Sequence, residues 1–178
     1  MSVKRLFVAI AVPPEIRLAL YACKNSVVQT GLSWVKEENL HITLLFMGDT
    51  PESEIASIKH SLSGLSNRTP FLLQCKQVEA VRRRGKLSMI WAGFEESTQF
   101  IELATSVSKV LNVPLDHKPL PHMTLARVKR GYQVKVDTSL FPDISLYSWE
   151  VNSFGLWESV LNPQGSIYTV LQEWHFNA

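Results

Sequence analysis

Two short segments of the chain repeat one pattern of residues, and both contain side chains that transfer protons and bind phosphate. They read His41-Ile42-Thr43-Leu44 and His122-Met123-Thr124-Leu125, and their histidines are 81 positions apart in a chain of 178 residues. Residues two apart in a β-strand point to the same face. We therefore expect the histidine and the threonine of each motif to share one surface, while the apolar residues between them face the core.

This combination of side chains suits displacement at phosphorus. Imidazole has an ordinary pKa of ~6.5, so it gives or takes a proton near neutral pH. Two imidazoles that face one cleft can act as a general acid and a general base, and two hydroxyls can donate hydrogen bonds to the non-bridging oxygens. The predicted catalytic residues are His41, Thr43, His122 and Thr124, with the two threonines also binding substrate.

A zinc site is the main alternative for paired histidines. It needs at least a third protein ligand, and neither motif contains a cysteine or a carboxylate. Asp116-His117 precedes the second motif and offers a ligand pair, but we interpret His117 as a loop residue. We predict no bound metal and no cofactor.

The apolar patterns predict an α+β fold. Strands are expected over residues 5–12, 40–47, 71–81, 87–94, 149–157 and 166–174, with a turn at 162–165. Helices are expected to begin near Pro14, near Glu52, and at Ser97 or Thr98 as a cap. Hairpin-linked neighbours favour antiparallel sheets flanked by helices over a doubly wound parallel sheet. The half-chain spacing of the motifs favours two pseudo-symmetric lobes within one domain, residues 1–178, with the active-site cleft between them.

Composition describes an ordinary globular chain. Hydrophobic residues make up 46% and charged residues 19%, with a formal net charge of only +2. The two cysteines have no metal or redox spacing, and the apolar run before Pro13 is too short to span a membrane. We expect a cytoplasmic monomer. The basic cluster Arg82-Arg83-Arg84-Gly85-Lys86 fits either a solvated loop or a phosphate-recruiting surface.

At these residues the sequence resembles the two-histidine (2H) phosphoesterase superfamily, and within it the RNA 2′,3′-cyclic phosphodiesterase group historically named 2′-5′ RNA ligases. The resemblance covers essentially the whole chain. It is carried by Arg5-Leu6-Phe7-Val8-Ala9-Ile10, Trp34-Val35, Glu38-Asn39-Leu40-His41-Ile42-Thr43-Leu44, Phe46-Met47-Gly48, Pro121-His122-Met123-Thr124-Leu125-Ala126-Arg127, Leu156 to Ser159, Gly165 and Tyr168.

The resemblance implies opening of a terminal RNA 2′,3′-cyclic phosphate to a 2′-phosphate, without metal or nucleotide cofactor, and reversible 2′-5′ ligation. By analogy, His41 protonates the departing 3′ oxygen and His122 activates water, although the roles could swap between substrates. We place Arg127, Phe7 and Tyr168 among the substrate-binding residues. A residue such as Phe7 is more often part of the core than a base-stacking platform, and Tyr168 fits the core and the cleft equally well.

Two other functions remain open from the sequence. The same chemistry could act on 2′-5′-linked oligonucleotides or on a small cyclic nucleotide. A module that binds RNA or nucleotides without turnover is the alternative outside catalysis, but it has no need of both imidazoles. Apart from Trp34, which precedes the first motif, the tryptophans are interpreted as packing residues: Trp91, Trp149, Trp157 and Trp174.

Overall fold

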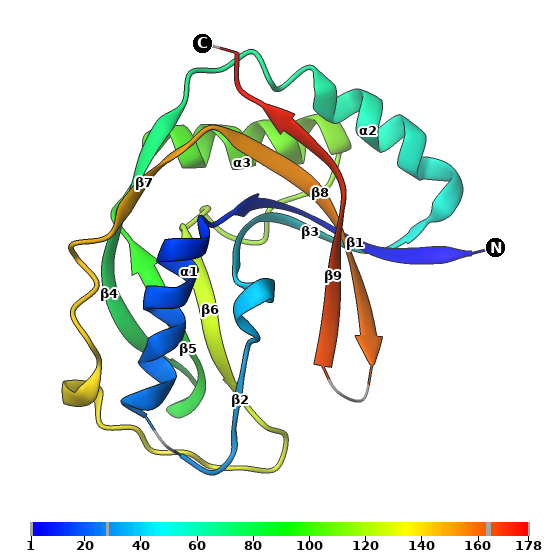
Figure 1. Cartoon of the computed structure of the whole chain (residues 1–178). Coiled ribbons are helices and arrows are strands. Elements are labelled where there is room, and N and C mark those ends of the chain that lie inside the picture. Colours follow the sequence, from blue (N-terminus) through cyan, green and yellow to red (C-terminus); the bar gives the residue numbers. More distant parts are fainter. Residues whose placement is uncertain (1, 28, 163–164, 178) are drawn as a thin grey trace.

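Two antiparallel sheets form the framework of the computed structural model, which describes residues 2–27, 29–162 and 165–177. One sheet has the strand order β3-β1-β8-β9, and the other has the order β2-β6-β5-β4-β7. Figure 1 shows the two sheets splayed apart, with α-helices around them. The α+β class and the antiparallel sheets expected from the sequence are confirmed.

The first sheet is built around the N-terminal strand. β1 (Val3–Ala11) pairs with β3 (His41–Pro51) on one side and with β8 (Ser153–Asn162) on the other. β9 (Gly165–His175) completes the sheet by pairing with β8 as a long hairpin. The turn expected at 162–165 includes residues 163 and 164, which lie outside the described residues.

The second sheet contains the other motif. β6 (His122–Val128) pairs with the short β2 (Leu32–Trp34) and with β5 (Lys86–Phe94), which forms a hairpin with β4 (Phe71–Arg83). β7 (Ser148–Val151) pairs with the opposite edge of β4. In each sheet, therefore, the strand that carries a motif pairs antiparallel with an inner strand: β3 pairs with β1, and β6 pairs with β5.

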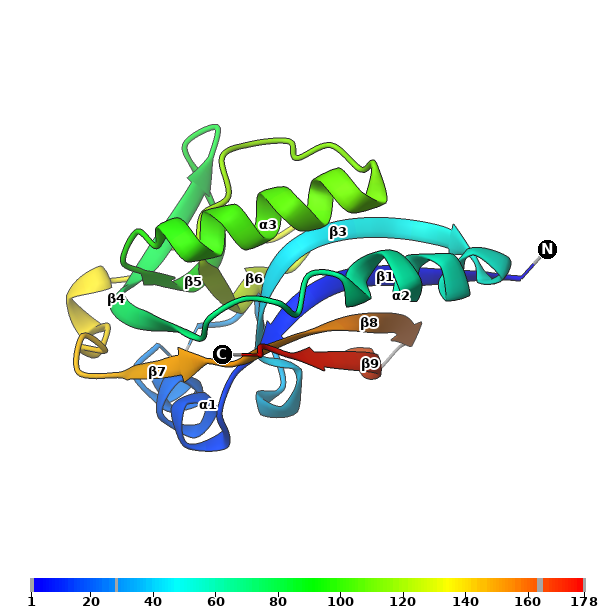
Figure 2. The same ribbon diagram turned by 90° about the horizontal axis from the view of Figure 1, so that it is seen from above.

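Helices cover the sheets where the apolar spacing predicts them. α1 (Pro14–Tyr21) starts with a proline, whose fixed φ suits the first helical position. α3 (Thr98–Leu111) is capped by Ser97, whose Oγ accepts a hydrogen bond from the backbone N–H of Phe100 at 3.2 Å. α2 (Ile55–Ser63) packs against α3, and α3 packs against β3 (Figure 2).

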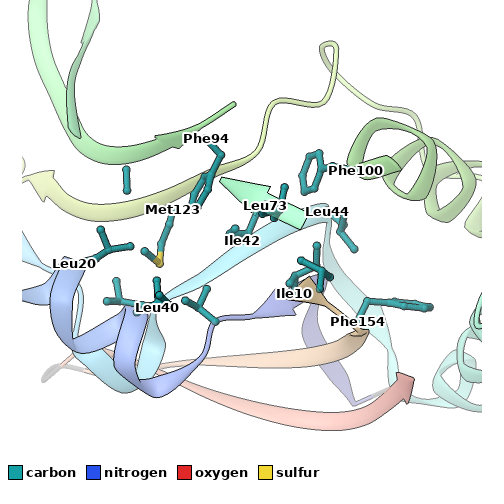
Figure 3. Packing of buried hydrophobic residues seen from close by; sticks show 14 of the residues in the cluster. Ile10, Leu20, Leu40, Ile42, Leu44, Leu73, Phe94, Phe100, Met123 and Phe154 are labelled. Atoms are coloured by element: carbon teal, nitrogen blue, oxygen red, sulfur yellow. The ribbon is translucent and has the colours of Figure 1, made fainter. Parts of the chain in front are cut away.

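The core joins the two sheets and anchors both motifs. Ile42, Leu44, Met123 and Leu125 are all buried, with exposed fractions of 0–4%. Figure 3 shows Ile42, Leu44 and Met123 in one packed cluster with side chains from β1, β4 and the helices. Because successive residues of a strand point to opposite faces, burial of the two apolar residues places the histidine and the threonine of each motif on the other face of the strand.

One predicted strand differs from the structure. The apolar stretch over 149–157 is two strands, because exposed Asn152 lies between Val151 at the end of β7 and Ser153 at the start of β8. The chain changes sheets at this point, and pairs with β4 before it and with β1 after it. Among the described residues, no helix is long and apolar enough to cross a membrane.

Candidate active site

A cleft of about 460 Å³ lies between the two sheets and brings the motifs together. All four predicted catalytic residues line it, as do the predicted binding residues Arg127, Phe7 and Tyr168. The cleft is completed by residues from β1, β3, β8, β9 and the segment after β2: Arg5, Val35, Phe46, Ser159, Leu161 and Ser166. The arginine cluster at 82–86 and the histidines outside the motifs are not among its lining residues.

The two imidazoles are held in the same way. His41 Nδ1 lies 2.7 Å from the carbonyl oxygen of Asn39, and His122 Nδ1 lies 2.8 Å from that of Leu120. A carbonyl only accepts hydrogen bonds, so Nδ1 of each neutral ring carries the proton and donates it. Nε2 is then the unprotonated nitrogen of each ring, and it is available to the cleft. The repeated sequence pattern therefore produces a repeated tautomer.

The two sites differ in how their carbonyl is supported. Asn39 is buried, and its side-chain Nδ2 donates a hydrogen bond to the carbonyl of Ser166 on β9 at 2.7 Å. The corresponding residue in the second motif, Leu120, is 53% exposed. The His41 ring is thus attached through Asn39 to the β8–β9 hairpin, whereas the His122 ring depends on a surface segment.

Both histidines favour the neutral form in the free protein. Burial lowers the pKa of His41 below its ordinary value, the Asn39 carbonyl opposes this, and positive charge on Arg127 and His122 lowers it further. Burial also lowers the pKa of His122, against the effect of the Leu120 carbonyl, and Arg127 adds to the lowering. The pair is therefore prepared to accept protons, and an anion in the cleft would reverse the effect of Arg127.

The two threonines present free hydroxyls to the same space. Neither Thr43 nor Thr124 has a side-chain hydrogen-bond partner in the described part of the chain, and both line the cleft. A hydroxyl can rotate to donate its proton wherever an acceptor arrives. Two unengaged donors beside two imidazoles and a guanidinium make a site suited to a phosphate group.

Three aromatic rings surround His41. Its imidazole centroid is 4.9 Å from that of Phe7, 5.1 Å from Tyr168 and 5.9 Å from Trp157. Phe7 is only 3% exposed and packs on Trp157, so it forms the wall behind the histidine, while half-buried Tyr168 stands at the cleft. Phe7 is thus buried and also lines the cleft, and Tyr168 lines the cleft.

One aromatic ring contacts His122, although residue type alone indicates a packing role for it. Trp91 on β5 lies 4.4 Å from the imidazole, centroid to centroid, and its Nε1 donates a hydrogen bond to Glu79 Oε2 at 3.1 Å. The packing interpretation of Trp91 and Trp157 is therefore incomplete, because each ring also contacts a motif histidine. The available signal was strand pairing: Trp91 lies opposite Thr124 in the β5–β6 register, which places it on the motif face.

A further contact at the cleft rim also has no counterpart among the sequence predictions. The Arg5 guanidinium lies 4.9 Å from the ring centroid of Phe46, which is 50% exposed. Both residues line the cleft beside the first motif. Within the described residues, no group of three or more His, Cys, Asp or Glu side chains is arranged to hold a metal ion.

Comparison with known proteins identifies the family. Residues 10–91 match the family described as LigT like Phosphoesterase. A protein of Archaeoglobus fulgidus named RNA 2′,3′-cyclic phosphodiesterase is 35% identical over 173 residues, an alignment that covers 94% of this chain and 98% of the relative. The chain belongs to the LigT-like (2H) phosphoesterase family. The resemblance inferred from the motifs is thereby confirmed.

Solved structures of LigT-like proteins share the fold. TT0787 of Thermus thermophilus superposes with a TM-score of 0.82 at 30% identity, covering 97% of each chain. Escherichia coli LigT, solved in complex with phosphate, gives a TM-score of 0.81 at 24% identity over the whole of both chains. The second similarity shows the fold alone.

Proposed function

We propose that this LigT-like protein hydrolyses the terminal 2′,3′-cyclic phosphate of RNA to a 2′-phosphate, without a metal ion. The observation that carries the proposal is the pair of imidazoles, each fixed with Nε2 available to one cleft that also holds two unengaged threonine hydroxyls. The substrate is supported by the relatives that are named RNA 2′,3′-cyclic phosphodiesterase, such as the protein of Archaeoglobus fulgidus.

In the proposed reaction one neutral histidine takes a proton from water through Nε2, and the water oxygen attacks phosphorus. The bond from phosphorus to the 3′ oxygen breaks, and the protonated form of the other histidine gives its proton to that oxygen. The product is a 2′-phosphomonoester with a free 3′ hydroxyl. The two histidines then exchange protons with solvent and return to their starting forms.

The resemblance assigns the acid role to His41 and the base role to His122. Thr43 and Thr124 donate hydrogen bonds to the non-bridging oxygens, where negative charge increases in the transition state. Arg127 adds a positive charge that acts on both imidazoles and on the phosphate. Formation of a 2′-5′ linkage is the same chemistry in reverse, with a ribose hydroxyl in place of water.

Tyr168 and Phe7 form the side of the cleft next to His41. Because Tyr168 is half-buried and lines the cleft, we assign it a contact with the terminal nucleoside. Phe7 is almost fully buried, so its part in substrate binding is to support the His41 ring at 4.9 Å.

Ring opening in the presence of EDTA tests the proposal. A short RNA that ends in a 2′,3′-cyclic phosphate should be opened by the wild-type protein, and His41→Ala or His122→Ala should each lower the rate by about 10²- to 10⁴-fold. His60→Ala is the matched control, because that histidine is exposed on α2. Opening that requires added metal, or full activity in either motif variant, would overturn the proposal.

A further inference from the structure

The positive charge of the chain is concentrated at one end of the second sheet. Residues 80–94 and 121–131 contain seven of the 18 Lys and Arg residues and none of the 16 Asp and Glu residues. One of the seven, Arg127, lines the cleft. The other six are called here the basic track: Arg82, Arg83, Arg84, Lys86, Lys129 and Arg130.

Strand pairing places the basic track on neighbouring strands at one end of the second sheet. β4 and β5 are joined at Arg83 and Lys86, which pair with each other, and Met89 of β5 pairs with Arg127 of β6. Because β5 and β6 are antiparallel, β6 continues past Arg127 into Lys129 and Arg130 at the same end of the sheet as the start of β5. Lys86 is three residues from Met89, so the tip lies ~10 Å along the strand from Arg127.

The basic track takes part in no ion pair within the described chain. Arg82, Arg83, Arg84 and Lys86 are exposed, and no member of the basic track forms an ion pair with any residue that the structure describes. Elsewhere three of the eight described lysines form ion pairs, among them Lys4 with Glu158 and Lys118 with Glu96. Unpaired guanidinium and ammonium groups along a strand edge attract a polyanion.

The turn at the hairpin tip supports a role for its arginine. β4 and β5 are joined by Arg84 and Gly85 alone, with φ values of 49° and 77°. Two-residue hairpins of this kind favour asparagine, aspartate or glycine at the first position, because other side chains are strained at positive φ. An arginine therefore occupies a position that another residue would fill at a lower conformational cost.

On the side of the cleft formed by the β8–β9 hairpin, exposed apolar side chains replace the positive charges. Leu161 on β8 is 65% exposed at the cleft, and Val160 and Ile167 of the same hairpin are 49% and 51% exposed. The ammonium group of Lys4, on β1 beside this hairpin, is paired with Glu158. Because a cyclic phosphate is the 3′ terminus of its RNA, all other phosphates lie on the 5′ side and must leave the cleft in one direction. The charge distribution favours departure over the second sheet.

We propose that the basic track binds the phosphates of the nucleotides on the 5′ side of the cyclic phosphate, so that the preferred substrate is the end of an RNA strand and not a cyclic mononucleotide. This inference rests on the proposed function of the cleft. It assigns the arginine cluster, which the catalytic chemistry does not use, to recognition of the polynucleotide.

The test compares substrates of different length. The triple variant Arg82→Gln/Arg83→Gln/Arg84→Asn removes three charges, with asparagine chosen at 84 because it tolerates positive φ. The control variant Lys59→Gln/Lys76→Gln/Lys109→Gln removes three charges from α2, the middle of β4 and α3. For each protein, kcat/KM is measured on a 2′,3′-cyclic mononucleotide and on single-stranded RNAs of increasing length with the same terminus.

We expect the wild-type kcat/KM to rise with RNA length and to fall with salt. The track variant should lose about 10-fold or more on the longer RNAs and reduce the salt slope by about two, since each phosphate contact on a single strand contributes ~0.7. Its activity on the mononucleotide, and the control variant on all substrates, should stay close to wild type. Equal losses on all lengths, no length dependence in wild type, or equal losses in the control variant would overturn the proposal.

A binding measurement separates this proposal from the function of the cleft. The affinity for a fluorescent single-stranded RNA with a 3′-phosphate, followed by anisotropy, requires no turnover. The track variant should bind about 10-fold more weakly than wild type and the control variant. If ring opening fails but this difference appears, only the proposed reaction is wrong; if wild type, the track variant and the control variant bind equally, the role proposed for the basic track is wrong.

Discussion

The indole ring of Trp91 lies 4.4 Å from the imidazole of His122, centroid to centroid, with 41° between the ring planes. Its Nε1–H donates to Glu79, and Gln77 Nε2 donates to the other oxygen of the same carboxylate at 3.3 Å. The carboxylate therefore fixes the indole beneath the histidine. An aromatic face attracts a cation, so this arrangement favours the protonated form of His122 that arises during turnover.

Trp91→Leu should lower the pKa of His122 and reduce kcat/KM by about 2- to 30-fold, the range that corresponds to the loss of a cation–π contact. Trp91→Phe should retain part of both effects. Titration of the histidine resonances by NMR measures the pKa directly. Trp149→Phe is the control, because that indole packs against Phe94. A Leu variant with the wild-type pKa and rate would contradict the role given to Trp91.

The pH dependence follows from the lowered pKa values of both histidines. In the free protein one histidine must be neutral and the other protonated, so kcat/KM should reach its maximum on the acidic side of ~6.5 and fall as the acid loses its proton at higher pH. The two apparent values belong to the pair of groups. The kcat profile should lie at higher pH, because a bound phosphodiester anion raises the pKa of both rings.

Arg127 provides an internal check on this profile. Its positive charge lowers the pKa of both histidines, so Arg127→Gln should move the kcat/KM maximum toward higher pH, whatever its effect on the absolute rate. Rates measured over a range from acidic to mildly alkaline pH at constant ionic strength decide the matter. A maximum on the alkaline side of ~6.5 in the wild type, or an unmoved maximum in the variant, would show that these histidines do not control the rate.

The threonine hydroxyls are testable by substitutions of similar size. Thr43→Val and Thr124→Val each remove a donor, and each should lower kcat by about 10²-fold, as loss of one oxyanion donor does in other enzymes. Thr43→Ser and Thr124→Ser keep the hydroxyl and should recover most of the rate. Steady-state kinetics on the RNA substrate, with thermal unfolding to check the fold, measures this. Valine variants with wild-type kcat would remove the hydroxyls from the mechanism.

Local patterns are sufficient to predict the elements that carry the motifs. Alternation over Ile42 and Leu44 identifies a strand with one buried face, and the pair Ser97-Thr98 identifies the start of α3, where the structure selects Ser97 as the cap. The switch of sheets at Asn152 is not predictable in this way, because apolar β-formers recur on both sides of it, as at Val151 and Phe154. Which strand each half pairs with depends on contacts distant in sequence.

The site is predictable where residue type alone identifies chemistry, as at His41 and His122. It is not predictable where an apolar side chain serves either packing or the site. Trp157 is 8% exposed, which is typical of a core residue. Its ring nevertheless stacks on the imidazole of His41, with 29° between the ring planes. Only the pairing of β1 with β8, which places Phe7 opposite Trp157, brings that ring to the motif.

The position of the phosphate in the product tests the central claim most directly. A short RNA with a 2′,3′-cyclic terminus is incubated with the wild-type protein in EDTA, and the product is compared with 2′-phosphate and 3′-phosphate standards by chromatography. The proposed mechanism predicts a 2′-phosphate, formed by wild type and not by the His41→Ala/His122→Ala variant. An unopened ring, opening only after a metal is added, or a 3′-phosphate product would contradict it.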